Sequence, residues 1–154
     1  MIARWERGFT MIELAIVLVI AGLIAGVAGP KLADGLRQQS VRAAADQFVL
    51  AHSLARSTAL RYGRVAELRI DAAGTRFWVE VDTSGTGVRD TVGFVRNPAD
   101  AGVKMTSTRT LLCFDARGLA TTGGACQPGD ATVVFASSSR AATVRVTTLG
   151  KVLR

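Results

Sequence analysis

An uncharged apolar segment near the N-terminus constrains this chain more than any other feature. Leu14 to Gly29 contains sixteen consecutive residues without a charge, and starting from Phe9 extends the segment to 21 residues with one carboxylate, Glu13. A helix needs roughly 20 apolar residues to cross a bilayer. Arg4 and Arg7 precede the segment, and basic residues hold a short flank of a membrane helix in the cytoplasm. We therefore expect one membrane-spanning helix, with the rest of the chain on the outer side.

Glu13 is the exception within this segment and needs an explanation. An ionised side chain inside a membrane helix costs roughly 2.5 kcal/mol or more and normally has a partner. One interpretation places Glu13 at the level of the lipid headgroups, about one helical turn from the start of the segment. The other provides a cation, because cleavage between Gly8 and Phe9 would create a terminal ammonium on a packed neighbour. We favour the second interpretation, since it gives the carboxylate a counter-charge.

The residues from Gly8 to Leu14 resemble the type III signal of type IV pilins and type II secretion pseudopilins. A glycine precedes the cut, Phe9 follows it, and Glu13 stands at the expected spacing, whereas Met11 occupies a position where leucine is commoner. The resemblance implies that a prepilin peptidase removes residues 1–8 as a leader and methylates Phe9. It also implies that Glu13 acts in assembly and that other pilins or pseudopilins pack against the transmembrane and assembly helix of residues 9–29.

A conventional secretory signal is the alternative. Residues 1–7 would then be its basic region and Leu14–Ala25 its apolar core, and the small residues Gly26, Ala28 and Gly29 could imitate a cleavage site. Cleavage there would discard the helix and would leave Glu13 without a role. The pilin-like signal is therefore favoured.

The rest of the chain has the size of one domain. The sequence has 154 residues, and about 120 remain beyond the apolar segment, enough for one modest core. The formal net charge is +7. A basic chain tends toward phosphates or anionic surfaces, but a solvated charged face explains the same composition.

Two cysteines, Cys113 and Cys126, lie in the part expected outside the cytoplasm. In an oxidising compartment, such a pair indicates a disulfide. Closing a loop of this size would stabilise the fold by about 3 kcal/mol in the chain-entropy model. Zinc would need about four ligands, and His52 is the only histidine of the sequence. We expect a disulfide, and neither a metal nor a cofactor.

A second helical pattern follows the apolar segment. Gly29 and Pro30 are expected to loosen or kink the helix, which can then resume. Apolar and small residues recur at steps of three and four, which predicts an amphipathic helix over residues 30–62 that ends at Gly63. Its buried stripe is predicted to contain Ala33, Leu36, Ser40, Val41, Ala44, Phe48, Ala51, Ala55, Thr58, Ala59 and Tyr62.

After Gly63 the period changes to two. Arg64–Ile70 and Arg76–Asp82 alternate around the turn residues 71–74, which predicts a β-hairpin. Further β-like runs are Val92–Val95, Val103–Thr106, Leu111–Asp115, Thr132–Ala136, Thr143–Thr147 and Lys151–Leu153. We predict an α+β fold, in which the long N-terminal helix packs on an antiparallel β-sheet or sandwich formed by a periplasmic, β-rich domain of residues 63–154.

This order, with the motif Phe114–Gly118 and the basic end Gly150–Arg154, resembles the GspH/FimT family of minor pseudopilins and minor pilins. In that family, GspH-like subunits join a short periplasmic pseudopilus, and FimT-like subunits prime or decorate pili. The resemblance implies a single-pass inner-membrane protein that inserts into a pilus-like fibre and supports its assembly and protein secretion. Secreted cargo is a further candidate partner.

DNA binding is the alternative function, because some members of the family bind DNA during uptake. Arg140, Arg145, Lys151 and Arg154 lie within the last fifteen positions with no acidic residue among them, and could form a footprint for phosphates. Those DNA-binding members end in a Gly-Arg-x-Arg-like pattern, whereas here Lys151 follows the glycine and the final arginine comes one residue later. A solvated outer strand face is the favoured explanation.

Catalysis has little support. His52 and Ser53 are adjacent on the predicted helix, where neighbouring side chains point in different directions. The aspartates are scattered among predicted turns, where aspartate is common, and they lack the spacing of a calcium loop. We expect this protein not to be an enzyme.

Overall fold

The computed structural model describes residues 10–123, 125–126, 130–138 and 140–153, with only the backbone of Val27 and Pro30. The predicted leader, residues 1–8 with Gly8 at its end, and the predicted new terminus Phe9 lie outside the described residues. The chain divides into two compact units, residues 1–36, here called the N-terminal unit, and residues 37–154, here called the head.

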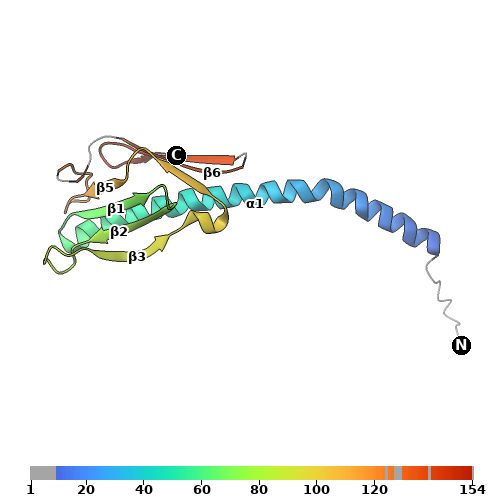
Figure 1. The fold of residues 1–154 in the computed structure, drawn as a ribbon, viewed down its shortest axis with the longest axis horizontal. Coiled ribbons are helices and arrows are strands. Elements are labelled where there is room, and N and C mark those ends of the chain that lie inside the picture. Colours follow the sequence, from blue (N-terminus) through green and yellow to red (C-terminus); the bar gives the residue numbers. More distant parts are fainter. Residues whose placement is uncertain (1–9, 124, 127–129, 139, 154) are drawn as a thin grey trace, which may run out of the picture. The chain divides into compact units, whose positions relative to one another are not determined.

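One helix, α1 (Met11–Tyr62), contributes to both units (Figure 1). It begins after Thr10, whose hydroxyl oxygen accepts a hydrogen bond from the backbone N–H of Glu13 at 3.2 Å. The helical assignment continues through Gly29 and Pro30. The helix ends at Tyr62, and the following Gly63 has a φ of +62°, which suits glycine at a left-handed helix end. The predicted long helix is therefore confirmed over its described residues.

Large apolar side chains in the N-terminal unit are exposed. Leu18 is 71% exposed and Leu23 is 68% exposed. Within the described residues, α1 is the one helix long and apolar enough to cross a membrane, and no part of its apolar window is buried inside the protein.

The head contains two four-stranded sheets in which every pair of neighbouring strands is antiparallel. The first sheet, ordered β3-β2-β1-β5, consists of β1 (Ala66–Asp71), β2 (Arg76–Val81), β3 (Asp90–Arg96) and β5 (Leu111–Phe114). The second, ordered β4-β6-β7-β8, consists of β4 (Lys104–Ser107), β6 (Ala131–Ser137), β7 (Arg140–Val146) and β8 (Val152–Leu153). A short 3-10 helix, η1 (Pro98–Ala101), precedes β4. The predicted α+β class is confirmed.

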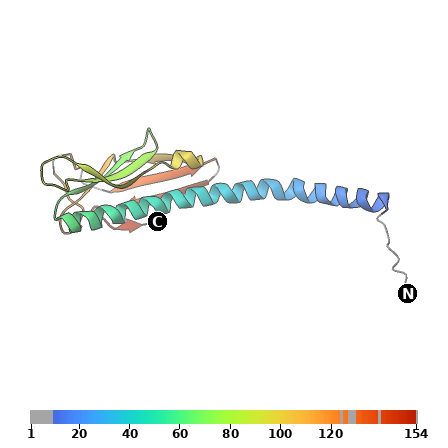
Figure 2. The same cartoon turned by 90° about the horizontal axis from the view of Figure 1, so that it is seen from below.

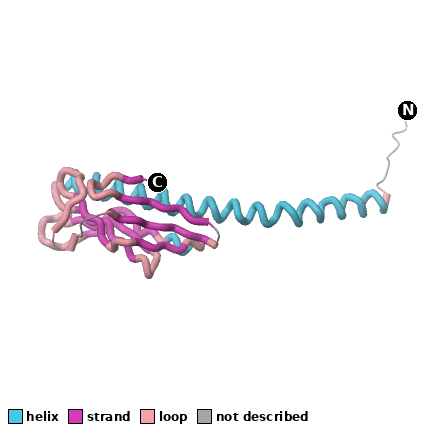
Figure 3. The backbone as a smooth tube through the Cα atoms, turned by 90° about the horizontal axis from the view of Figure 1, so that it is seen from above, coloured by secondary structure: helices cyan, strands magenta, loops and turns pink. Residues whose placement is uncertain are grey.

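The core lies where α1 meets both sheets, as Figures 2 and 3 show for the head. Phe48 of α1 packs on Phe77 of β2, with ring centroids 5.4 Å apart, and on Phe135 of β6 at 6.0 Å. The rings of Phe77 and Phe135 are themselves 6.3 Å apart. All three side chains are fully buried. One aromatic cluster thus joins the helix and the two sheets.

The predicted buried stripe of α1 is confirmed from Val41 to Ala59, half-buried at Ser40 and Tyr62, and wrong at Ala33 and Leu36. Phe48, Ala55 and Ala59 have no exposed surface, whereas Leu36 is 57% exposed and Ala33 is also exposed. Helical periodicity identifies a face of a helix but not where along the helix its partner begins. Each predicted β-like run overlaps a strand, and the register Ala66↔Val81 to Asp71↔Arg76 confirms the first hairpin.

Candidate functional site

The first turn of α1 holds the predicted assembly carboxylate. Thr10 and Glu13 have the spacing of a capping box, in which a threonine caps the helix and an acid occupies the third helical position. Glu13 is exposed, and an acidic residue in a first turn interacts favourably with the helix dipole. Sequence reasoning missed the cap, although the Thr-x-x-Glu pattern was visible. Since Phe9 lies outside the described residues, the geometry that relates Glu13 to a terminal ammonium stays a prediction.

His52 has a structural position in the head. It is 2% exposed, and its ring meets that of Phe114 edge-on with centroids 4.9 Å apart. Burial and the nearby Arg56 lower the pKa of His52 from 6.5 to about 4, against the opposing effect of a hydrogen bond to the Gly150 backbone. The neighbouring Ser53 is exposed. His52 and Ser53 therefore lie on different faces of α1 and do not form a base and a nucleophile.

Cys113 of β5 and Cys126 form a disulfide, with their Cα atoms 5.7 Å apart. The predicted pairing is confirmed. Glu67 lies opposite Cys113 in the register of β1 and β5, and these three residues form a group of potential metal ligands among the described residues. Because the two sulfur atoms are bonded to each other, they offer no thiolate for a metal.

An ion-pair network that sequence reasoning missed surrounds Glu67. Its carboxylate is buried and pairs with the guanidinium of Arg89 at 2.7 Å and with that of Arg69 at 3.1 Å. Arg69 also binds Glu80, which accepts a hydrogen bond from the indole N–H of Trp78 at 2.6 Å. A buried carboxylate needs such compensation. Arg89 thereby fastens the start of β3 to β1.

The motif Phe114–Gly118 forms a turn that docks on α1. The Asp115 carboxylate accepts hydrogen bonds from the backbone N–H groups of Leu119 and Arg117, both at 2.9 Å. These bonds, the one from Leu119 foremost, lower the pKa of Asp115. The Gly118 carbonyl accepts a hydrogen bond from Arg56 Nε at 2.8 Å. The motif therefore has a structural explanation.

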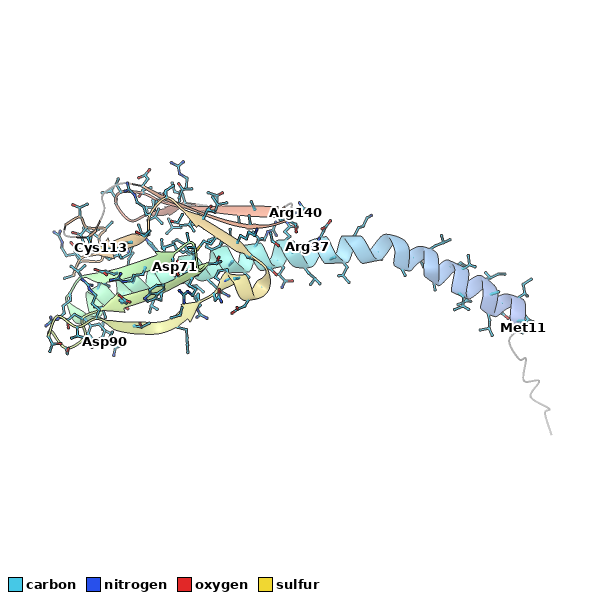
Figure 4. All side chains as sticks on the ribbon, viewed as in Figure 1. Met11, Arg37, Asp71, Asp90, Cys113 and Arg140 are labelled. Atoms are coloured by element: carbon cyan, nitrogen blue, oxygen red, sulfur yellow. A yellow bond between two sulfur atoms is a disulfide. The ribbon has the colours of Figure 1, made fainter. Side chains whose placement is uncertain are left out.

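The basic residues proposed for DNA are not all brought together. Arg140 begins β7 and lies at the end of the head away from Cys113 and Asp90 (Figure 4). Arg145 is five positions further on, so the two side chains leave the strand on opposite sides. Arg145 lies near Lys151, since it pairs with Leu153 of β8, but Asp130 is 3.8 Å from its guanidinium. Arg154 lies outside the described residues.

Comparison with protein-family models decides the family. The model described as type II transport protein GspH matches residues 44–150, about two thirds of the chain. The chain belongs to the GspH family. A second model, the prokaryotic N-terminal methylation motif, matches residues 6–29 of this GspH-family chain. The predicted family and the predicted type of N-terminal signal are both confirmed.

Solved structures share the fold of this GspH-family chain. The minor pseudopilin EpsH from the type 2 secretion system of Vibrio cholerae matches with a TM-score of 0.57 and 14% identity, over 74% of this chain and 94% of that chain. The type IV minor pilin FimU of Pseudomonas aeruginosa (strain PAO1) matches with a TM-score of 0.54 and 16% identity, over 75% and 87%. No curated protein sequence matches the chain significantly.

Proposed function

We propose that this chain is a minor pseudopilin of a type II secretion system, or a closely related type IV pilus minor pilin. In this role it inserts into a periplasmic pilus-like fibre and supports fibre assembly and protein secretion. The observation that carries the proposal is the uncovered apolar half of α1, joined to a GspH-type head on the same chain. Such a surface needs lipid or other apolar helices around it.

The N-terminal unit explains how one segment serves two environments. Before assembly, residues 9–29 lie in the inner membrane as a single span, with the head in the periplasm. A prepilin peptidase cuts after Gly8, and the new terminus at Phe9 is methylated, in agreement with the match to the methylation motif. On extraction, the exposed leucine and isoleucine side chains exchange lipid for the helices of neighbouring pilins or pseudopilins.

Glu13 directs this exchange. In the fibre, its carboxylate pairs with the terminal ammonium of a neighbouring subunit, which compensates a charge that would otherwise be expensive to bury. The capping threonine helps to form the first turn, so that the carboxylate is presented at a defined position on the helix. The action is assembly and not catalysis.

The DNA-binding alternative has weaker support. Arg140 and Arg145 leave β7 on opposite sides, and Asp130 offsets part of the charge of Arg145. Lys151, the third described residue of this set, follows a tight turn in which its backbone N–H donates a hydrogen bond to the Thr147 hydroxyl. A solvated face explains these residues.

The test compares Glu13→Leu with Leu14→Ile, an apolar substitution at the next position. Both chains are expressed from the native locus, and their incorporation is measured by co-purification with sheared or over-assembled fibres. Glu13→Leu is expected to remain in the membrane and to be lost from fibres, whereas Leu14→Ile incorporates normally. Normal incorporation of Glu13→Leu would contradict the assembly role of the carboxylate.

A further inference from the structure

A groove of about 300 Å³ separates α1 from β3 within the head. Its walls are mainly apolar, with Leu50 and Leu54 contributed by α1 and Val92 and Phe94 by β3. Phe94 is 77% exposed and Leu50 is 68% exposed. Isolated surface apolar residues are common, but here large ones from two elements line one concavity.

The groove lies beside an open sheet edge. β3 is the terminal strand of its sheet, and in the described part of the chain only β2 pairs with it. The register shifts between Phe77 and Val79, and Gly93 has a φ of +80°. A side chain at Gly93 would come within 3.1 Å of Leu54. This bulge brings the backbone of β3 close to α1, next to the groove.

Arg96 gives the groove a positive charge. It lines the groove, and its guanidinium lies 5.6 Å from the centroid of the Phe94 ring. Arg89, at the other end of β3, is already paired with the buried Glu67. Among the described residues, Arg96 forms no ion pair, so its guanidinium is available to a ligand's carboxylate. Charge complementarity therefore favours an acidic group beside an apolar one.

We propose that β3 and this groove bind an extended segment of a neighbouring pilin-like subunit. The segment adds to the free edge of β3 as a fifth strand, places an apolar side chain between Leu50 and Phe94, and sets a carboxylate on Arg96. Strand addition of this kind takes affinity from main-chain hydrogen bonds and specificity from side-chain pockets. The proposal rests on the proposed function, because it names a contact that a fibre subunit makes through its head.

The experiment uses the full chain in cells that assemble the fibre. The photo-crosslinking residue p-benzoylphenylalanine replaces Phe94, which keeps an aromatic ring in the groove. The same residue at Leu149, which is 79% exposed on the turn before β8, is the control for exposure alone. A third chain carries it at Leu18, where it reports packing of the apolar half of α1. Crosslinked peptides are identified by mass spectrometry.

The expected result is a crosslink from Phe94 to a pilin-like subunit, in a peptide with an apolar residue and a neighbouring Asp or Glu. Adding Arg96→Glu should lower its yield about tenfold, because a charge-assisted contact becomes a repulsion. Arg140→Glu, a matched charge reversal at the exposed start of β7, should leave the yield unchanged. Changing the identified carboxylate to Lys should restore the crosslink to the Arg96→Glu chain.

Three results would overturn the proposal. Crosslinks from Leu18 without any from Phe94 would show that the chain assembles but leaves the groove empty, so that the proposed function survives alone. An absence of crosslinks from both positions would contradict the proposed function and the groove contact together. A product from Phe94 that contains a second copy of this chain or a secreted protein would assign the groove to a different partner.

Discussion

The two halves of α1 contain similar apolar residues in opposite environments. In the N-terminal unit, Ile12 and Leu18 are 70% and 71% exposed, whereas Phe48, in the head, has no exposed surface. Both halves are helical and contain Ala, Leu and Val, although the second interleaves them with more charged residues, such as Arg42 and Asp46. The difference is that the head supplies two sheets to cover one half. The other half needs partners from outside the chain, which is why its substitutions should affect assembly and not the stability of the head.

The largest effect on stability should come from Phe48→Ala. Removing a fully buried ring that joins α1 to both sheets should lower the free energy of unfolding of the head by about 3–5 kcal/mol. Urea unfolding of the detergent-solubilised chain, followed by tryptophan fluorescence, measures it. A loss below about 1 kcal/mol would mean that the aromatic cluster is not the centre of the core.

Acidification should act on the head through His52. Because its pKa is about 4 in the folded protein and 6.5 when exposed, the unfolded state binds the additional proton between these values. Stability should therefore fall as pH drops from 6.5 toward 4, by on the order of 3 kcal/mol. His52→Gln should lack this decline. Equal pH slopes for the two chains in urea titrations would argue against a buried neutral histidine.

Breaking the disulfide should have a comparable or smaller effect. Cys113→Ser with Cys126→Ser should lower the free energy of unfolding by about 2–4 kcal/mol. The same measurement under reducing conditions should bring the parent chain to the level of the double variant. A parent chain insensitive to reductant would indicate that the bond does not form in the cell.

Thr10→Ala should have a smaller and local effect. Loss of the cap should weaken the start of α1 by about 1 kcal/mol and should reduce fibre incorporation partially, because the turn that presents Glu13 frays. Thr10→Ser should restore incorporation, since serine caps equally well. The free energy of unfolding of the head should not change in either variant. A change would contradict the separation of the N-terminal unit from the head.

Leu18→Ala should have the smallest effect on the head, close to zero, although the same substitution in a core would cost about 2–5 kcal/mol. Its consequence should appear instead in the yield of assembled fibre. A measurable loss of head stability in the urea titration would show that the N-terminal unit is covered by the chain itself.

The sequence was sufficient for features with a local cause. The apolar segment predicted the exposed half of α1, alternation around residues 71–74 predicted β1 and β2, and two cysteines predicted the disulfide. It was insufficient wherever the answer depends on which elements meet. Leu36 continues the helical pattern but is 57% exposed, and Glu67 looks like an ordinary outward strand residue until Arg69 and Arg89 converge on it.

The candidate sites were likewise predictable from the sequence only where their residues are contiguous. The signal around Gly8 and Glu13 is contiguous, so it could be found without a structure. The groove beside β3 could not, since its residues come from positions 47–54, 78–79 and 92–96 and depend on a bulge at Gly93. The spread of Arg140 and Arg145 over two sides of β7 likewise depends on where that strand begins.

Two side chains of α1, one helical turn apart, contact the turns that follow β5 and β7. Arg56 donates a hydrogen bond to the carbonyl of Gly118, and the buried His52 lies beside the backbone of Gly150. A pulling force applied along α1 would load these two turns at the same time as the aromatic cluster. The head should therefore resist tension along α1 as one unit.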